Sequence, residues 1–219
     1  MKREQITESL EESGIIAVIR LDDVARLEKI IQALSAGGIR ALEITMTTPN
    51  AVDIIRSLAR KLNKDFLLGA GTVLDTTSAE QVIDAGAQFV VSPVLNIDVI
   101  RKAHEFDKPC LPGSFTPTEI LTAWQNGADI VKIFPATALG PRFFKDIHGP
   151  LPDIKMTPTG GVDLDNAAKF IEAGACCLGV GTSLLDKQMI ANEDWPGLTA
   201  LAKKFIAEVK KGRQLTPHS

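Results

Sequence analysis

The sequence contains little of what several classes of protein require. Only three cysteines occur among 219 residues; Cys176 and Cys177 are adjacent, Cys110 stands apart, and none lies in a CxxC motif. The three histidines are not at the spacing of metal ligands. This pattern argues against a disulfide framework and against a metal site built from Cys and His. We interpret the cysteines as small core residues and expect a protein without a metal or a cofactor.

Long hydrophobic runs and a strong excess of one charge are also missing. No apolar run approaches the roughly 18 residues that span a bilayer, and the polar N-terminal stretch does not resemble a signal peptide. The net charge of -3 offers no electrostatic basis for binding nucleic acid or an anionic membrane. With 45% hydrophobic and 23% charged residues, the composition is typical of a globular protein, which we expect to be cytoplasmic.

The sequence does contain a regular alternation of short apolar runs and helical segments. A helix is predicted over about 3–12, and eight strand-helix units follow at intervals of about 20–28 residues, with no linker-like segment between them. The predicted strands cover 15–20, 41–46, 66–73, 89–93, 110–114, 130–135, 155–161 and 176–181. The predicted helices cover 24–36, a segment starting at 48–49, 78–86, 98–106, 117–126, 141–147, 165–173 and 195–211.

This alternation predicts the fold class. Strands that alternate with helices pair in parallel through right-handed crossovers, and eight such units in about 200 residues match a closed (β/α)8 barrel. Ala-Gly pairs within 36–38, 85–87 and 173–175 are typical of left-handed helix C-caps. An open doubly wound sheet is the alternative, but no Gly-x-Gly-x-x-Gly motif opens the first helix. We predict a single α/β domain over 1–219, a TIM barrel with an extra N-terminal helix.

One predicted strand, 130–135, has a lysine in its middle. Burying an unpaired ammonium is costly, so Lys132 should either be paired or be held as the neutral amine. A desolvated lysine amine can attack a ketone and form a Schiff base. The alternative is a lysine near the strand end whose amine reaches solvent along its flexible stem.

A second buried charge is predicted at Glu43, between Leu42 and Ile44. Glu43 and Lys132 both hold the third position of their strands, which predicts a similar depth in the barrel. A purely structural ion pair is the alternative, but buried pairs add little net stability and perturbed charges cluster at functional sites. The other polar residues in these otherwise apolar strands are Arg20, Thr45, Thr72 and Thr159.

Two glycine clusters follow the last two predicted strands. Gly160-Gly161 ends the seventh strand, and Gly179-Val180-Gly181-Thr182-Ser183 ends the eighth. In barrels of this kind, these loops often bind phosphate through backbone N–H groups and a helix N-terminus. The alternative is that the glycines serve only tight turns.

These motifs, taken in order, resemble the 2-keto-3-deoxy-6-phosphogluconate (KDPG) aldolase family, which includes 4-hydroxy-2-oxoglutarate aldolase. The resemblance extends from about Ile15 to Leu184. It rests on the stretches 42–45, 69–73, 92–93, 112–113, 131–136 and 158–162. Its most specific parts are Lys132-Ile133-Phe134-Pro135 and Pro158-Thr159-Gly160-Gly161.

The resemblance implies a role for each matching residue. Lys132 corresponds to the Schiff-base lysine and Glu43 to the general acid/base. Around the substrate, it implies that Thr72 and Thr159 surround the pyruvyl group, that Pro93 and Phe134 form its walls, and that Gly160, Gly161, Gly181, Thr182 and Ser183 bind the phosphate. Thr47 stands where many members have an arginine that meets the substrate carboxylate. Arg20 could supply that cation instead, the alternative being that it pairs with a nearby acid.

The resemblance also implies a function. The expected protein is a homotrimeric class I aldolase that cleaves KDPG to pyruvate and glyceraldehyde 3-phosphate, with 4-hydroxy-2-oxoglutarate as a further substrate. The phosphogalactonate-derived epimer is the alternative substrate. Two other classes remain open: a phosphate-binding barrel without an amine nucleophile, such as a sugar-phosphate epimerase or thiamin-phosphate synthase, and a non-catalytic barrel that binds a phosphorylated metabolite.

Overall fold

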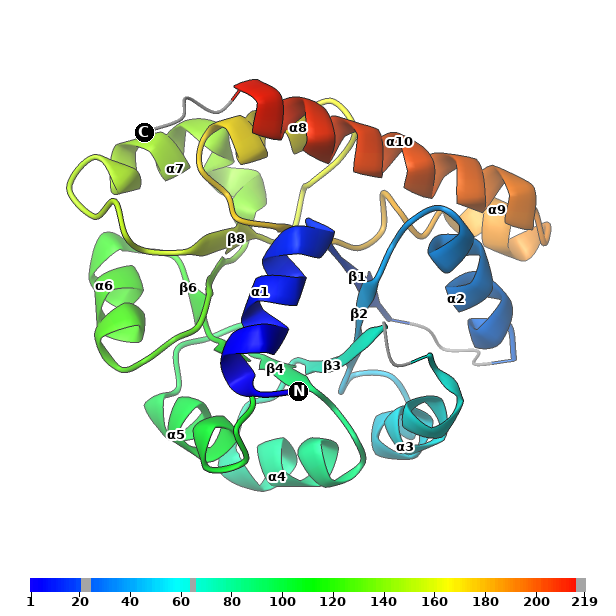
Figure 1. Ribbon diagram of the computed structural model, residues 1–219, viewed down its shortest axis with the longest axis horizontal. Helices are drawn as coiled ribbons and strands as arrows, with labels where there is room; N and C mark the ends of the chain where they lie inside the picture. The colour runs from blue at the N-terminus through cyan, green and yellow to red at the C-terminus, as the bar shows by residue number, and fades with distance from the viewer. Residues whose placement is uncertain (21–24, 64–65, 216–219) are drawn as a thin grey trace.

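The computed structural model describes residues 1–20, 25–63 and 66–215. Its strands, which form the inner wall in Figure 1, are β1 (Ile15–Ile19), β2 (Ala41–Thr45), β3 (Leu67–Gly71), β4 (Phe89–Val91), β5 (Cys110–Leu111), β6 (Gly113–Ser114), β7 (Val131–Ile133), β8 (Met156–Pro158) and β9 (Leu178–Val180). Its helices are α1 (Arg3–Ser13), α2 (Leu27–Ala36), α3 (Ala51–Lys61), α4 (Thr76–Asp84), α5 (Ile97–Glu105), α6 (Pro117–Gln125), the 3-10 helix η1 (Ala136–Ala138), α7 (Gly140–His148), α8 (Ala167–Glu172), α9 (Lys187–Ala191) and α10 (Trp195–Leu215).

The strands form a closed parallel barrel. One sheet has the order β5-β4-β3-β2-β1-β9 and the other β6-β7-β8. At one junction, β5 and β6 are two halves of the predicted fifth strand, separated by Pro112. Proline has no N–H to donate to a neighbouring strand, which accounts for this interruption. At the other junction, isolated bridges join Met156 to Ala175 and Thr159 to Gly179. Helices surround this barrel in Figure 1, and the (β/α)8 prediction is confirmed.

Several predicted boundaries differ from the structure. α2 begins at Leu27, and Val24, where the sequence predicts its start, lies outside the described residues. α3 begins at Ala51 rather than at Pro49, because Asn50 adopts a left-handed conformation with φ of 56° and forms the N-cap. The helices η1 and α9 are absent from the prediction, since segments this short show no helical periodicity.

Glycines end several helices as the Ala-Gly pairs predict. Gly38, Gly86 and Gly174 have φ values of 100°, 111° and 101° just after α2, α4 and α8. Residues with a Cβ rarely adopt this left-handed region, so glycine turns the chain toward the next strand at little cost.

Two hydrophobic clusters divide the core. The larger one lies between the barrel wall and the surrounding helices, and the smaller one fills the barrel interior. Ile6 and Leu10 of α1 belong to the smaller cluster and pack with Ile16, Ala41 and Leu67, which lie near the N-terminal ends of their strands. In Figure 1, α1 accordingly crosses the centre of the ring of helices. The N-terminal helix therefore closes this end of the barrel, and the opposite end is left for a site.

Candidate active site

Strand β7 carries Lys132 into the interior of the barrel. Val131 and Ile133 are buried in the outer cluster, whereas Ile130 belongs to the inner one. Because side chains alternate along a strand, Lys132 points inward. Its side chain is 5% exposed, which disagrees with an amine that simply reaches solvent. Its Nζ lies 5.1 Å from the centre of the Phe134 ring.

Strand β2 places Glu43 in the interior by the same alternation. Leu42 and Ile44 lie in the outer cluster and Ala41 in the inner one, so Glu43 shares the inward face with Ala41. The Glu43 side chain is 3% exposed. The structure thus contains the two buried, oppositely charged side chains that the sequence predicts.

The charges of this interior group act on one another. Burial raises the pKa of Glu43 above its ordinary value, because low-dielectric surroundings disfavour a carboxylate. The positive charges of Lys132 and Arg20 oppose this shift and lower the pKa, but burial has the larger effect. These three side chains therefore lie close enough to interact. A carboxyl group with a raised pKa suits proton transfer near neutral pH.

A glycine on the neighbouring strand makes room for the Glu43 carboxylate. A Cβ on Gly71 would lie 2.2 Å from Oε1 and 2.7 Å from Cδ of Glu43. No real Cβ tolerates such contacts, so any larger residue at position 71 would displace the carboxylate. Gly71 is paired in register with Thr45, which lies two residues beyond Glu43 on β2.

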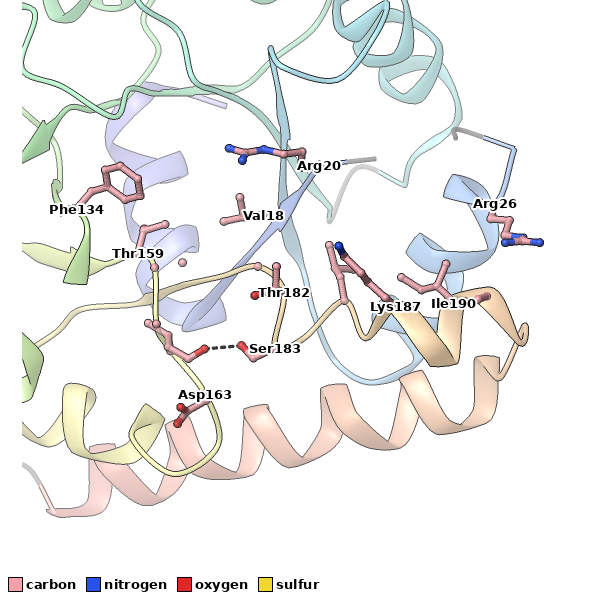
Figure 2. A pocket seen from close by; sticks show the side chains of 17 residues that line it. Val18, Arg20, Arg26, Phe134, Thr159, Asp163, Thr182, Ser183, Lys187 and Ile190 are labelled. Atoms are coloured by element: carbon pink, nitrogen blue, oxygen red, sulfur yellow. Dashed lines mark hydrogen bonds between the residues drawn. The ribbon is translucent and has the colours of Figure 1, made fainter. Parts of the chain in front are cut away.

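A cavity of about 610 Å³ opens where β1, β8 and β9 end (Figure 2). Phe134 links it to Lys132, since the ring lies near Nζ and also lines the cavity. The predicted site residues on its wall are Arg20, Phe134, Thr159, Gly160, Gly161, Gly181, Thr182 and Ser183. Its other lining residues are Val18, Arg26, Val162, Asp163, Gly179, Leu185, Lys187, Ile190 and Ala191. The reactive pair therefore lies inside the barrel, next to an open cavity that the two glycine loops border.

The two glycine loops present free backbone donors to the cavity. The N–H groups of Gly161, Thr182 and Ser183 donate to no group in the described part of the chain. The Ser183 hydroxyl donates to the carbonyl of Val162, which joins the loops (Figure 2). Unpaired N–H groups that converge on a cavity can bind an anion.

No helix begins directly at the glycines of this predicted anion site. α8 and α9 begin only at Ala167 and Lys187, several residues beyond the glycines, and both are short. Loop backbone intervenes because Asn166 donates from Nδ2 to the carbonyl of Gly161 at 2.8 Å, which holds a turn before α8. The donors are therefore those of the loops alone.

The other three predicted residues do not line the cavity. Thr47, Thr72 and Pro93 follow β2, β3 and β4, which continue the barrel wall from β1. The Thr47 hydroxyl lies 3.0 Å from that of Thr45, and Thr72 adopts a left-handed φ of 60°. The backbone of Pro93 approaches so closely that a Cβ on Gly113 would lie 2.2 Å from its carbonyl. Their roles toward a substrate remain predictions.

Sequence reasoning missed two cations on the cavity wall. Lys187 begins α9, and Figure 2 shows its amine directed toward the side where Thr182 and Arg20 lie. Arg26 points away from that side and forms an ion pair of 3.5 Å with Glu193. Asp186 is the signal that could have revealed α9, because its carboxylate accepts bonds from the N–H groups of Gln188 and Met189, as an N-cap residue does.

The remaining candidate groups lie away from this cavity. Cys110 and Cys177 are buried, and Cys176 is partly buried. Burial raises the pKa of the Cys110 thiol well above its ordinary value, which makes it a poor nucleophile. Within 1–20, 25–63 and 66–215, no group of three His, Cys, Asp or Glu residues could hold a metal ion. None of the described helices is long and apolar enough to cross a membrane.

Comparison with known proteins supports this picture. Residues 6–201 match the family described as "Aldolase: KDPG and KHG aldolase". The 2-dehydro-3-deoxy-phosphogluconate aldolase of Pseudomonas aeruginosa is 36% identical over 205 residues, which cover 93% of this chain and 92% of that protein.

Two solved structures extend the comparison to three dimensions. A structure described as native KDPGal has a TM-score of 0.84 at 30% identity, covering 92% of this chain and 96% of that one. KDPG aldolase from Legionella pneumophila, with pyruvate captured as a covalent carbinolamine intermediate, has a TM-score of 0.83 at 30% identity, covering 90% and 96%. On the match of sequence, fold and family motifs, the chain belongs to the KDPG and KHG aldolase family.

Proposed function

We propose that the protein is a class I aldolase that cleaves KDPG to pyruvate and glyceraldehyde 3-phosphate through a Schiff base on Lys132. The observation that carries this proposal is the pair of buried charges, Lys132 and Glu43, beside an open cavity. A buried lysine next to a proton-transfer group is the arrangement that imine formation requires. The relatives named above support the same reaction.

In the first half of the reaction, the neutral amine of Lys132 attacks the C2 carbonyl carbon of the substrate. Glu43 donates a proton to the carbinolamine hydroxyl, which leaves as water, and a protonated imine remains. The raised pKa of Glu43 favours the protonated carboxyl that this step needs. The barrel interior assists by excluding bulk water from the imine.

In the second half, the imine accepts the electron pair of the C3–C4 bond. The bond breaks as the C4 hydroxyl loses its proton to Glu43, and glyceraldehyde 3-phosphate leaves. The proton returns to C3 of the enamine, and hydrolysis of the resulting imine releases pyruvate and the free Lys132 amine. Every step uses side chains of this chain, water and the substrate.

The remaining predicted residues would hold the substrate on either side of the reacting carbons. Phe134 and Pro93 form walls of the pyruvyl pocket, while Thr72 and Thr159 bind its polar atoms. Many family members bind the substrate carboxylate with an arginine where this chain has Thr47, and Arg20 takes over that role here. Two observations support this: the charge of Arg20 lowers the pKa of Glu43, and Arg20 lines the cavity. The phosphate lies against Gly160, Gly161, Gly181, Thr182 and Ser183, whose loops offer the free N–H groups.

Substrate choice between epimers follows from the relatives. The Pseudomonas aeruginosa relative, at 36% identity, supports KDPG. The KDPGal structure, at 30% identity, supports the galactonate-derived epimer as the second candidate. The family description also includes KHG, so 4-hydroxy-2-oxoglutarate, which yields pyruvate and glyoxylate, is a further proposed substrate.

Borohydride trapping tests the proposal. The protein is mixed with pyruvate, reduced with borohydride and digested, and modified lysines are located by mass spectrometry. We expect a reduced adduct on Lys132 and none in Lys132→Met. Lys155→Met is the matched control. Lys155 is also partly buried, but its amine forms an ion pair of 2.5 Å with Glu11 and does not line the cavity. This variant should be labelled like the wild type.

The other outcomes separate the rival functions. No adduct on any lysine would overturn the aldolase assignment and favour a phosphate-binding isomerase or synthase. Binding of KDPG without turnover would favour a non-catalytic binder. Cleavage rates with KDPG, its galactonate epimer and 4-hydroxy-2-oxoglutarate then rank the substrates.

The assembly is proposed to be a homotrimer of single-domain chains located in the cytoplasm. What supports self-association is a rim patch of three exposed apolar side chains, Leu74, Val94 and Phe115, which are 50%, 50% and 40% exposed. They follow the neighbouring strands β3, β4 and β6. Exposed apolar groups that lie close together are typical of protein contacts. Light scattering should give three times the chain mass of 23.5 kDa, and Phe115→Glu should reduce it.

A further inference from the structure

The cavity has cations at two different places along its wall. Arg20 ends near the reaction centre, since its charge lowers the pKa of Glu43. Lys187 comes from a different part of the wall, at the start of α9, and its charge is not among the causes of that shift. A substrate with two anionic ends could therefore meet a different cation at each end.

Lys187 is a cavity cation that is available to a ligand. No acid in the described part of the chain forms an ion pair with it, whereas Arg26 is paired with Glu193. In Figure 2 its amine is directed to the side of the cavity where Arg20 and Thr182 lie, and the N–H groups of Thr182 and Ser183 have no described partner. The amine and these donors therefore line the same cavity.

Asp163, the one carboxylate among the described residues of the cavity wall, hydrogen-bonds within its own loop. Asp163 accepts hydrogen bonds at Oδ1 from the N–H groups of Asp165 and Asn166, at 2.9 and 3.1 Å. It therefore stays with the turn before α8 and does not neutralise Lys187. A dianion would find neutral N–H donors from the loops and one full positive charge from Lys187.

We propose that Lys187 determines specificity for phosphorylated over unphosphorylated 2-keto acids, by binding the substrate phosphate together with the loop N–H groups. This inference rests on the proposed aldolase function and deepens it. The N–H groups are neutral donors, and Lys187 adds the full positive charge that favours a dianion over an uncharged end. Lys187 acts on binding and orientation, not on the bond that breaks.

The test compares two substrates that differ only in the phosphate. We would measure kcat/KM with KDPG and with 2-keto-3-deoxygluconate for the wild type, Lys187→Met and Lys187→Arg. Lys187→Met should lower kcat/KM for KDPG by roughly 5- to 30-fold, the effect of a charge-assisted hydrogen bond from an exposed side chain. It should leave the value for 2-keto-3-deoxygluconate within about twofold. Lys187→Arg should restore most of the loss.

Two controls exclude a structural explanation. Lys203→Met removes an exposed lysine of α10 that does not line the cavity, and should change neither value. The preference of the wild type for KDPG should fall with added KCl, because salt screens an exposed charge, while that of Lys187→Met should change less. An equal loss for both substrates, or no loss for KDPG, would overturn the inference.

Binding of inorganic phosphate separates this inference from the aldolase assignment. Calorimetric titration should show weaker phosphate binding to Lys187→Met than to the wild type, whether or not either protein cleaves KDPG. If the wild type does not cleave KDPG but this difference is found, the proposed reaction fails and the phosphate site stands. Equal phosphate affinity in both proteins would refute the role of Lys187.

Discussion

A Cβ on Gly71 would lie 2.2 Å from Oε1 of Glu43, so the carboxylate occupies the space that a side chain on β3 would need. Gly71 is not among the residues with positive φ, and its backbone conformation is therefore open to any residue. The missing side chain, and not the backbone, is what Glu43 requires. This relationship makes position 71 a sensitive probe of the site.

Substituting Gly71 by Ala should displace the Glu43 carboxylate and slow the reaction. A shift of about 1 Å in a proton-transfer group can cost roughly 100-fold, so we expect kcat with KDPG to fall by about that factor. The fold should survive with a loss of about 1–3 kcal/mol from overpacking. Steady-state kinetics and urea denaturation measure the two effects.

The matched control is Gly149→Ala. A Cβ there would make only ordinary contacts of 3.6 and 3.9 Å, and φ is -53°. Unchanged kcat and a small gain of about 0.4–1 kcal/mol are expected, because alanine restricts the unfolded chain. Wild-type kcat in Gly71→Ala would show that Glu43 needs no fixed position.

The raised pKa of Glu43 should make its contribution to stability depend on pH with a defined sign. The folded state holds this proton above the ordinary pKa of 4.5, where the unfolded chain has lost it. The contribution of Glu43 to the free energy of unfolding therefore falls as the pH rises from about 4.5 through the raised pKa. Below and above that range, this contribution does not change with pH. Urea denaturation from pH 4 to 8 should show the wild type losing stability relative to Glu43→Gln. The opposite slope would mean that Lys132 and Arg20 outweigh burial.

Removing the charge of Lys132 should raise the pKa of Glu43 further. The ammonium of Lys132 favours the carboxylate, and Lys132→Met deletes that attraction while keeping most of the length of the side chain. Carbon-13 NMR of the labelled glutamate carboxyl would follow the titration in both proteins. Lys155→Met is the control, since Lys155 is not among the causes of the shift. An unchanged titration in Lys132→Met would mean that the two groups do not interact.

The N-terminal helix should contribute stability without contributing to the chemistry. Leu10 is fully buried in the interior cluster, and Leu10→Ala should cost about 2–5 kcal/mol of unfolding free energy. Because Leu10 lies at the closed end of the barrel, kcat at a temperature where the variant is folded should stay within about twofold of the wild type. Glu12→Ala, on the exposed side of α1, should change stability by less than about 0.5 kcal/mol. A large fall in kcat for folded Leu10→Ala would contradict this separation.

Much of the fold and the reactive pair could be predicted from local patterns. The alternation of apolar runs and helices predicts the barrel, because each unit shows its own periodicity and turn signals. Lys132 and Glu43 are conspicuous because each interrupts an apolar run, and alternation along a strand then places both inside. Gly38, Gly86 and Gly174 likewise act within their own turns.

What only the tertiary structure decided depends on residues that are distant in sequence. The contact of Gly71 with Glu43, the closing of the barrel by Leu10 and the shared cavity of Lys187 and Arg20 each join different elements. No sequence period or motif encodes such distances, since they arise only when the strands close into a barrel and their side chains share one interior. The amino-acid sequence by itself determined which chemistry is present, and packing decided which groups meet.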